Sequence, residues 1–231
     1  MTHFELELSD LKNTLLTMAS HAESAVRQAV DAVVNRDYDR AMRVRTADAV
    51  IDRFEIDVDE TAIRLLAKAP LARNLRLIAV MMKISQNLER VGDEATKIAK
   101  RARDLSQEPP LKLAVAIPQL AELALQMLHT SLDAFVNQDA PAARALIPQD
   151  KQVDALNKDI HRLLADQMIS DAETVPRCLH LMVVAKSLER IADHAKNVAE
   201  EVVYLCEAED IRHAGKTAKT GSPPLEGNQA P

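Results

Sequence analysis

A stretch of helix-forming residues occurs twice in this chain, and the two copies lie one hundred positions apart. The first copy, LERVGDEATKIA, begins at Leu88, and the second copy, LERIADHAKNVA, begins at Leu188. Within each copy, apolar and small residues recur at intervals of three and four, which is the spacing of one face of an α-helix. A duplication of this kind restricts the chain to an architecture of two similar helical units.

The composition also favours helices. The 231 residues are 47% hydrophobic but include only 4 glycines and 2% aromatic residues. Sheet proteins need more turn glycines and more β-branched and aromatic residues in their strands. Alanine, leucine and the long charged residues, which favour helices, dominate instead. The sequence therefore predicts an all-α protein with enough apolar residues for a large core.

Apolar seams at helical spacing predict six long helices, three in each half of the chain. Turn signals separate these helices at Asn35-Arg36-Asp37, at Pro70, and at a linker that contains Pro109-Pro110. In the second half, one helix is expected to start at Asp139 and another at Thr174, each just before a proline. Because short loops make successive helices antiparallel, each half should form a three-helix bundle.

These boundaries divide the chain into two tandem bundles and a tail. The first bundle is predicted over residues 5–107 and the second over 111–208, with the fourth helix over about 112–137. Residues 216–231 are rich in Gly, Pro and polar residues and carry no apolar seam. We expect this tail to be disordered.

Charge and hydropathy exclude several classes of protein. The net charge of −6 argues against nucleic-acid binding through a broad basic face. The first residues, MTHFELELSD, do not resemble a signal peptide, and no apolar run approaches the ~20 residues of a transmembrane helix. Cys178 and Cys206 are expected to be free thiols. We expect a soluble, cytoplasmic protein.

Each repeated segment carries a pair of acidic residues on one helical face. Glu89 and Asp93 are four positions apart, and so are Glu189 and Asp193. Each acid follows a seam residue by one position, or about 100° around the helix. The acids should therefore flank the core, whereas His194 is expected to be a surface histidine.

The second helix of each bundle carries a matching acidic pair, Asp48 with Asp52 and Asp150 with Asp154. In antiparallel helices, residues equidistant from the connecting loop lie at the same level. This rule places both pairs of each bundle at one level, so four carboxylates should meet across one helix pair. Applied to the first helices, it places Glu23 level with Asp52 and His129 level with Asp150.

Two interpretations of these acids remain open from the residues themselves. Hard oxygen ligands suit Mg²⁺, Ca²⁺, Mn²⁺ or iron, and a bound cation would offset the repulsion among four carboxylates. The alternative is a solvated acidic stripe with Arg90, Lys97 and Lys100 as its counter-charges. Glu55 and Asp59 extend the stripe towards a loop and are expected to be solvated.

Taken together, the motifs resemble the PhoU family of regulators of phosphate signalling. The resemblance covers about residues 5–215 and rests on the pattern L-E-R-[VI]-[GA]-D in both third helices. Further matching segments are RLLAKAPLARNLRLI, KISQNLERVGDEATKIAKRA, QMLHTSLDAF, DKQVD, SLERIADHAKNVAEEVVY and IRHAG. One departure is Ala192 in place of the family glycine, which the first copy keeps as Gly92. It brings equal occupancy of the two sites into question.

The resemblance implies a cytoplasmic negative regulator of phosphate uptake and of the phosphate-starvation response. Such proteins act with the nucleotide-binding subunit of the phosphate ABC transporter and with a sensor histidine kinase. They reach the membrane through these partners, and many are homodimers. The resemblance also implies clusters of iron, zinc or magnesium, with manganese as a further oxygen-binding candidate. The matching ligand positions here are Glu23, Asp48, Asp52, Glu89, Asp93, Asp150, Asp154, Glu189 and Asp193.

Two other functions stay open beside a regulator without enzymatic turnover. A carboxylate-bridged metal enzyme would need inward-facing Glu and Glu-x-x-His motifs. Here Gly92 and Ala192 occupy the positions three residues after Glu89 and Glu189. No nucleophile–histidine arrangement and no glycine-rich phosphate loop is recognisable. The remaining alternative is an inert helical scaffold whose acids have no function.

Overall fold

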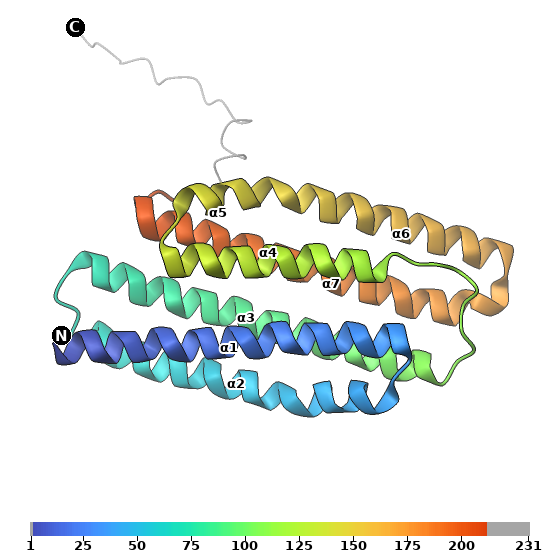
Figure 1. Cartoon of the computed structure of the whole chain (residues 1–231), viewed down its shortest axis with the longest axis horizontal. Coiled ribbons are helices and arrows are strands. Elements are labelled where there is room, and N and C mark those ends of the chain that lie inside the picture. Colours follow the sequence, from blue (N-terminus) through green and yellow to red (C-terminus); the bar gives the residue numbers. More distant parts are fainter. Residues whose placement is uncertain (1, 212–231) are drawn as a thin grey trace, which may run out of the picture.

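The computed structural model describes residues 2–211, and these residues form helices joined by short connections (Figure 1). Three helices build the first bundle, and the other helices build the second. The predicted all-α fold of two tandem three-helix bundles is confirmed. The elements are α1 (His3–Asn35), α2 (Tyr38–Leu66), α3 (Ala72–Ser106), α4 (Ile117–Asn137), α5 (Ala140–Leu146), η1 (Ile147–Gln149), α6 (Asp150–Ser170), η2 (Ala172–Thr174) and α7 (Val175–Glu207).

Two helix boundaries differ from the sequence prediction. The single helix expected after Asp139 is interrupted, because η1, a 3₁₀ turn that contains Pro148, separates α5 from α6. Proline cannot donate the backbone hydrogen bond that an α-helix interior requires. The fourth helix begins at Ile117 rather than near residue 112, so the linker continues up to that residue. The tail predicted over 216–231 lies outside the described residues.

The predicted turns between helices are built by capping residues. Arg36 ends α1 in the left-handed conformation, with φ of 54°, and the Asp37 side chain accepts a hydrogen bond from the Arg40 amide at 2.9 Å. The second bundle repeats this turn with Gln138, whose φ is 51°, and Asp139. The acidic caps satisfy amide groups that have no partner at a helix start. Each turn reverses the chain and makes its two helices antiparallel.

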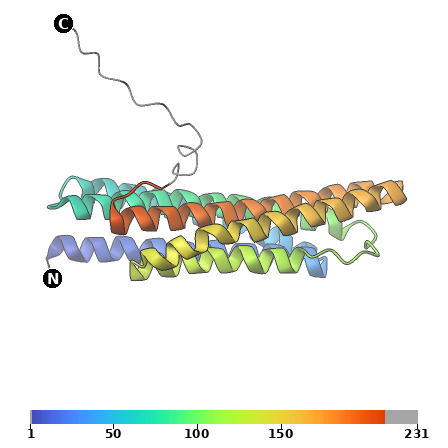
Figure 2. The same cartoon turned by 90° about the horizontal axis from the view of Figure 1, so that it is seen from above.

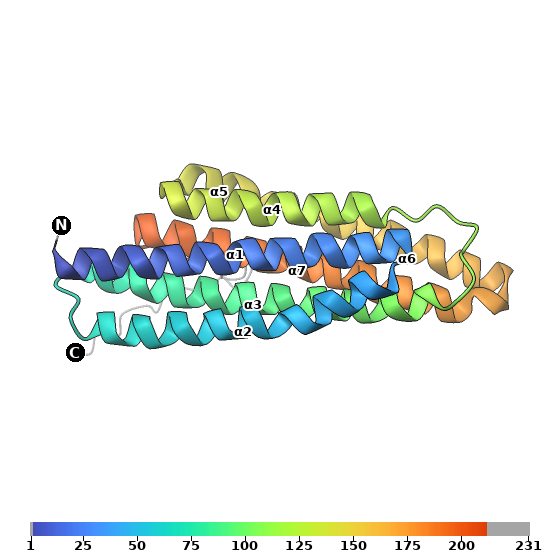
Figure 3. The ribbon, with the colours of Figure 1, turned by 60° about the horizontal axis from the view of Figure 1, so that its bottom comes forward.

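The two bundles lie side by side along one long axis and share a continuous core (Figures 1, 2 and 3). The third helices, α3 and α7, run antiparallel and pack against each other, and α1 packs against α4. Fully buried residues include Leu88 and Leu188 from the two copies of the repeated segment. The repeated segments therefore form the centre of the molecule rather than two separate cores. None of the described helices is long and apolar enough to cross a membrane.

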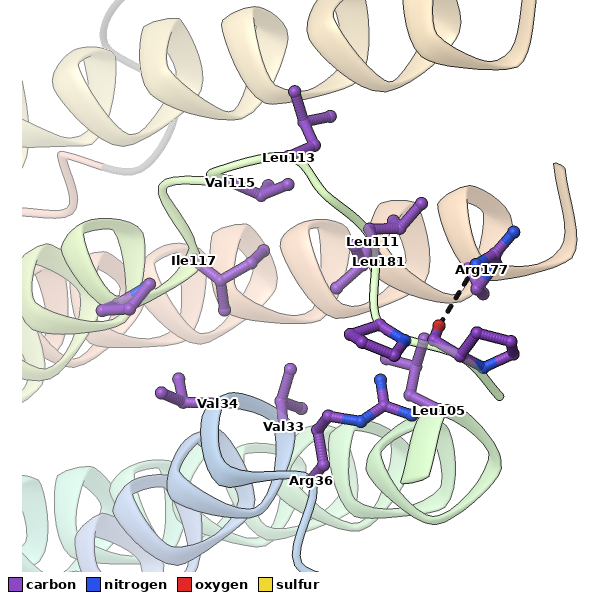
Figure 4. Close-up of a pocket in the computed structure, with 13 residues that line it drawn as sticks. Val33, Val34, Arg36, Leu105, Leu111, Leu113, Val115, Ile117, Arg177 and Leu181 are labelled. Carbon is purple, nitrogen blue, oxygen red and sulfur yellow. Dashed lines mark hydrogen bonds between the residues drawn. The ribbon is translucent and has the colours of Figure 1, made fainter. Parts of the chain in front are cut away.

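The linker between the bundles is held by two arginines (Figure 4). Arg36 donates to the carbonyl oxygen of Glu108, and Arg177 donates to that of Pro109 at 3.2 Å. Between the linker and the ends of α1 and α7 lies an apolar hollow of about 270 Å³. Its lining residues are Val33, Val34, Arg36, Leu105, Pro109, Pro110, Leu111, Leu113, Val115, Ile117, Pro118, Arg177 and Leu181.

Candidate functional site

The acids of the first bundle gather beside a close contact between α2 and α3 at Gly92. A β-carbon on Gly92 would lie 2.9 Å from Ile51 Cδ1, so only the absence of a side chain permits this contact without adjustment. The Oδ1 atom of Asp48 lies 3.5 Å from the same point. The mid-helix glycine thus allows the two helices, and the carboxylates beside it, to come together. We call Asp48, Asp52, Glu55, Glu89 and Asp93 the first acidic group.

The members of the first acidic group lie close enough for their charges to act on one another. Burial raises the pKa of Asp48, a hydrogen bond with Thr96 opposes this, and the charges of Asp52 and Asp93 raise it further. Burial also raises the pKa of Glu89, and Asp93 is the next contributor. Acids from both helices therefore share one site, as the level rule predicts, and they destabilise one another's charged forms.

Glu55 also belongs to this group, although the sequence interpretation placed it on a solvated face. Its side chain is half-buried, and burial, followed by the charges of Asp59 and Asp52, raises its pKa. Together with Glu89 it borders a surface hollow of about 430 Å³. The signal available in the sequence was its spacing, because Glu55 is three positions after Asp52 and shares its helical face.

Arg90 is the cationic side chain that the structure places against the first acidic group. Its Nε lies 3.4 Å from Glu89 Oε2, and its NH1 lies 3.8 Å from Asp93 Oδ2. The Arg90 side chain is 64% exposed, so solvent screens both interactions. One loosely held arginine leaves most of the negative charge of five carboxylates uncompensated.

The second bundle brings Asp150, Glu189 and Asp193 together, with lysines among them. We call Asp150, Asp154, Glu189 and Asp193 the second acidic group. Lys196 Nζ donates to Asp150 Oδ2 at 2.8 Å, and Lys186 pairs with Glu189. Burial raises the pKa of Asp193, and the charges of Asp150 and Glu189 add to the effect. Asp154 is half-buried on α6, one turn after Asp150.

Glu23 lies at the contact between α1 and α4. Its Oε1 is 3.4 Å from Nδ1 of His129, and Nε2 of the same ring is 3.4 Å from Asp133. The level rule had matched Glu23 with Asp52, and His129 with Asp150. The partner that the structure gives Glu23 is instead in the other bundle, because α1 faces α4 as well as α2.

The contact between α3 and α7 carries a polar network that the sequence did not reveal. Glu94 Oε1 accepts hydrogen bonds from Lys97 at 2.9 Å and from Arg190 on the opposite helix at 3.3 Å. His194 is half-buried and lies 3.0 Å from Asn87 Oδ1, so the expectation of a surface histidine is wrong. These residues lie on α3 and α7, in or beside the two copies of the repeated segment, and become neighbours only when the bundles pack together.

The donor set of the acidic groups fits hard cations, which bind carboxylate oxygens. Within residues 2–211, however, there is no group of three or more His, Cys, Asp or Glu side chains that could hold a metal ion. Metal binding at the predicted positions stays a prediction.

Comparison with known proteins identifies the family. The PhoU domain model matches residues 15–102 and again residues 117–202, one match in each bundle. A phosphate-specific transport system accessory protein PhoU homolog from Pseudomonas aeruginosa is 38% identical over 216 residues, which are 93% of this chain and 89% of the relative. The accessory protein PhoU from Escherichia coli is 35% identical over 92% of this chain and 88% of its own length.

Solved structures agree with this assignment. A crystal structure of PhoU from Pseudomonas aeruginosa matches with a TM-score of 0.86 and 37% identity, over 90% of this chain and 100% of the other. The phosphate transport system regulatory protein PhoU from Streptococcus pneumoniae matches with a TM-score of 0.83 and 28% identity, over 90% of this chain and 99% of the other. Both the sequence and the fold therefore lead to one conclusion: the chain belongs to the PhoU family.

Proposed function

We propose that this protein is a cytoplasmic negative regulator of phosphate uptake and of the phosphate-starvation response. It acts by binding the nucleotide-binding subunit of the phosphate ABC transporter and the associated sensor histidine kinase, and it catalyses no reaction. The observation that carries this proposal is the match, over 92–93% of the chain, to accessory proteins of phosphate-specific transport. Similarity along nearly the whole chain favours a function shared with these relatives over the alternative that only the helical fold is shared.

The acidic groups supply the working surface of the proposed regulator. Apart from the buried Asp150, they are half-buried or exposed on α2, α3, α6 and α7, where a partner can reach them, rather than lying inside a bundle as in carboxylate-bridged enzymes. Iron, zinc, magnesium or manganese bound by these carboxylates would bridge neighbouring helices and offset their mutual repulsion. The ion-loaded surface would then contact the transporter and the kinase when phosphate is plentiful, with the regulator as a homodimer.

Binding of this kind regulates only if the protein prefers one state of its partner. A regulator shifts an equilibrium by the difference between its affinities for the two states, and no further. The proposed regulator therefore binds the phosphate-replete state of the transporter more tightly than the starved state. Through that complex it holds the kinase in its inactive form.

A reporter of phosphate starvation tests the proposal directly. Alkaline phosphatase activity is measured in phosphate-rich medium in cells with the gene, without it, and with the gene restored on a plasmid. The proposal predicts high activity after deletion and repression again after restoration. Repression that persists without the gene, in a strain with no second gene of this family, contradicts the proposal. Pull-down of the transporter's nucleotide-binding subunit in phosphate-rich medium tests the partner.

A further inference from the structure

A surface hollow of about 460 Å³ lies where the two copies of the repeated segment meet, between α3 and α7. We call it the interbundle hollow. Six of its lining residues come in pairs from corresponding positions of the repeat, and these pairs are Arg90 with Arg190, Glu94 with His194, and Lys97 with Asn197. Asp193 completes the lining. The hollow therefore belongs to neither bundle alone and forms only when the two bundles pack together.

Three cationic side chains border the interbundle hollow from two helices. Arg90 and Lys97 on α3 and Arg190 on α7 are 64%, 49% and 51% exposed, so a small solute can reach them. Their charges converge on the ring of His194. Burial is the largest cause that lowers the pKa of this histidine, and all three cations lower it further. Cations this close together repel one another, and a bound anion would offset that repulsion.

The two carboxylates of the interbundle hollow do not use up these cations. Asp193 has Lys196 and Lys186 as counter-charges on its own helix. Glu94 accepts from Lys97 and Arg190 through a single oxygen, Oε1. A guanidinium group carries five N–H donors and an ammonium group carries three. Arg190 and Lys97 can therefore hold Glu94 and still donate to a ligand in the hollow.

The other oxygen of Glu94 indicates what kind of anion fits. Burial raises the pKa of Glu94, whereas hydrogen bonds with Lys97, Ser187 and Arg190 lower it, so the carboxylate is charged. Its Oε2 atom is buried, and it accepts no hydrogen bond of ordinary geometry from the residues that the structure describes. A buried acceptor without a donor is unfavourable. A ligand that brings an O–H group to this oxygen would remove the deficit.

We propose that the interbundle hollow binds inorganic phosphate. The side chains of Arg90, Lys97 and Arg190 donate to its charged oxygens, and Glu94 Oε2 accepts the hydrogen of the P–OH group that phosphate keeps at neutral pH. Sulfate has no such hydrogen, and a phosphate monoester has lost most of it at this pH. Either ion would place a bare anionic oxygen against the Glu94 carboxylate. The hollow therefore favours an oxyanion that is both charged and protonated.

Phosphate in this position would act on the contact between the bundles. Its oxygens would connect α3 to α7, because cations from both helices border the hollow. A ligand that binds only the packed arrangement stabilises that arrangement. This inference rests on the proposed function for its biological meaning and adds the ion that the regulator itself detects. Binding can be measured on the isolated chain, without any partner.

The test is isothermal titration calorimetry of the full chain with inorganic phosphate. Sulfate and glycerol 3-phosphate are the comparison ions, at the same ionic strength. Arg90→Gln and Lys97→Gln each remove one exposed cation from the hollow. Their matched control is Lys100→Gln, an exposed lysine about one turn further along α3 that does not line the hollow. Glu94→Gln replaces the acceptor with an amide that can also donate.

We expect one phosphate ion per chain, with sulfate and glycerol 3-phosphate bound at least about tenfold more weakly because like charges then face each other. Arg90→Gln and Lys97→Gln should each weaken phosphate binding about threefold to tenfold, since both cations are partly exposed. Lys100→Gln should bind phosphate as the wild type does. Glu94→Gln should reduce the preference for phosphate over sulfate, an effect that a merely structural role would not produce.

Three results would overturn the inference: no binding at millimolar phosphate, equal affinity for phosphate and sulfate in the wild type, or an equal loss of affinity in Lys97→Gln and Lys100→Gln. Circular dichroism establishes that each variant is folded. If Glu94→Gln does not fold, the two cation variants and the comparison ions still decide the question.

The starvation reporter separates this inference from the proposed function. Selective phosphate binding by a chain whose deletion leaves the reporter repressed contradicts the regulator but supports the phosphate site. Repression by a chain that binds no phosphate supports the regulator and overturns the phosphate site.

Discussion

Glu94 on α3 and Arg190 on α7 lie 3.3 Å apart, so the two copies of the repeated segment pair with each other across the centre of the molecule. The Glu94 side chain is only 5% exposed. Burial alone would raise the pKa of Glu94, but the lysine and arginine beside it hold this pKa below its ordinary value. The network therefore favours the charged carboxylate and ties the two bundles to one another.

Neutralising Glu94 should weaken the contact between the bundles. Glu94→Gln keeps the shape of the side chain but removes the charge that Arg190 and Lys97 neutralise. A lost hydrogen bond to a charged group costs about 1.5–3 kcal/mol, so we expect a decrease of this size in the free energy of unfolding. Urea denaturation measures it, and Glu122→Gln on the exposed face of α4 is the control. Equal stability of the two variants would contradict the role of Glu94.

Acid should weaken the same contact in a way that depends on His194. Burial lowers the pKa of His194, with the nearby Arg90, Lys97 and Arg190 acting in the same direction and Glu94 opposing them. The unfolded chain then binds the proton more readily than the folded chain. Stability is fully present above the ordinary pKa of 6.5 and is lost as the pH falls through the lower folded value.

Comparison with His194→Asn isolates this effect. The variant cannot titrate in that range, so its free energy of unfolding should fall less than that of the wild type between about pH 8 and about pH 5.5. Urea denaturation at a series of pH values gives both curves. Parallel curves would show that His194 carries no part of the pH dependence.

The close approach at Gly92 should distinguish small from large side chains. Gly92→Leu forces atoms against Ile51 and should destabilise the chain by about 1–3 kcal/mol, as overpacking does. Gly92→Ala should change stability by less than about 1 kcal/mol, because the end of a flexible isoleucine can move and alanine favours helices. Thermal unfolding measures both variants. A leucine variant as stable as the wild type would contradict the close contact.

Arg177 should be necessary for the position of the linker. It donates to the carbonyl oxygens of Pro109 and Glu173, at 3.2 and 2.8 Å. Arg177→Ala should therefore increase cleavage within residues 107–116 by a protease in limited digestion. Arg162→Ala provides the control, because the Arg162 side chain is 76% exposed and lies on α6. Equal cleavage of the two variants would show that Arg36 and the prolines hold the linker without Arg177.

The sequence predicts the fold well where the signal is local. The helices are defined by the apolar spacing, the caps at Asp37 and Asp139, and the proline linker. Their order and the short connections between them then determine the antiparallel arrangement of each bundle. The break at Pro148 is also local, but the apolar seam continues past it, so helical periodicity alone predicts one helix. The meeting of Asp48 with Asp93 follows from antiparallel geometry alone, since both helices leave one short loop.

Contacts between the bundles are harder to predict. Nothing in one bundle indicates that Glu94 will meet Arg190, or that Glu23 will meet His129, because these pairs depend on how two folded units pack. Within the first bundle, the burial of Glu55 depends on α3, although its spacing from Asp52 was a signal that the sequence offered. Corresponding residues of the repeat, such as Thr96 and Lys196, can be compared from the sequence. The effect of this difference, a hydrogen bond from Lys196 to Asp150, is visible only in the structure.

The central claim is that the two acidic groups are the working surface of a phosphate regulator. The most direct measurement is alkaline phosphatase activity in phosphate-rich medium, in a deletion strain that carries either the wild-type gene or a variant at equal protein level. The variant combines Glu89→Gln and Asp93→Asn with Glu189→Gln and Asp193→Asn, and we predict that it loses the repression that the wild-type gene restores. Full repression by this variant would contradict the claim.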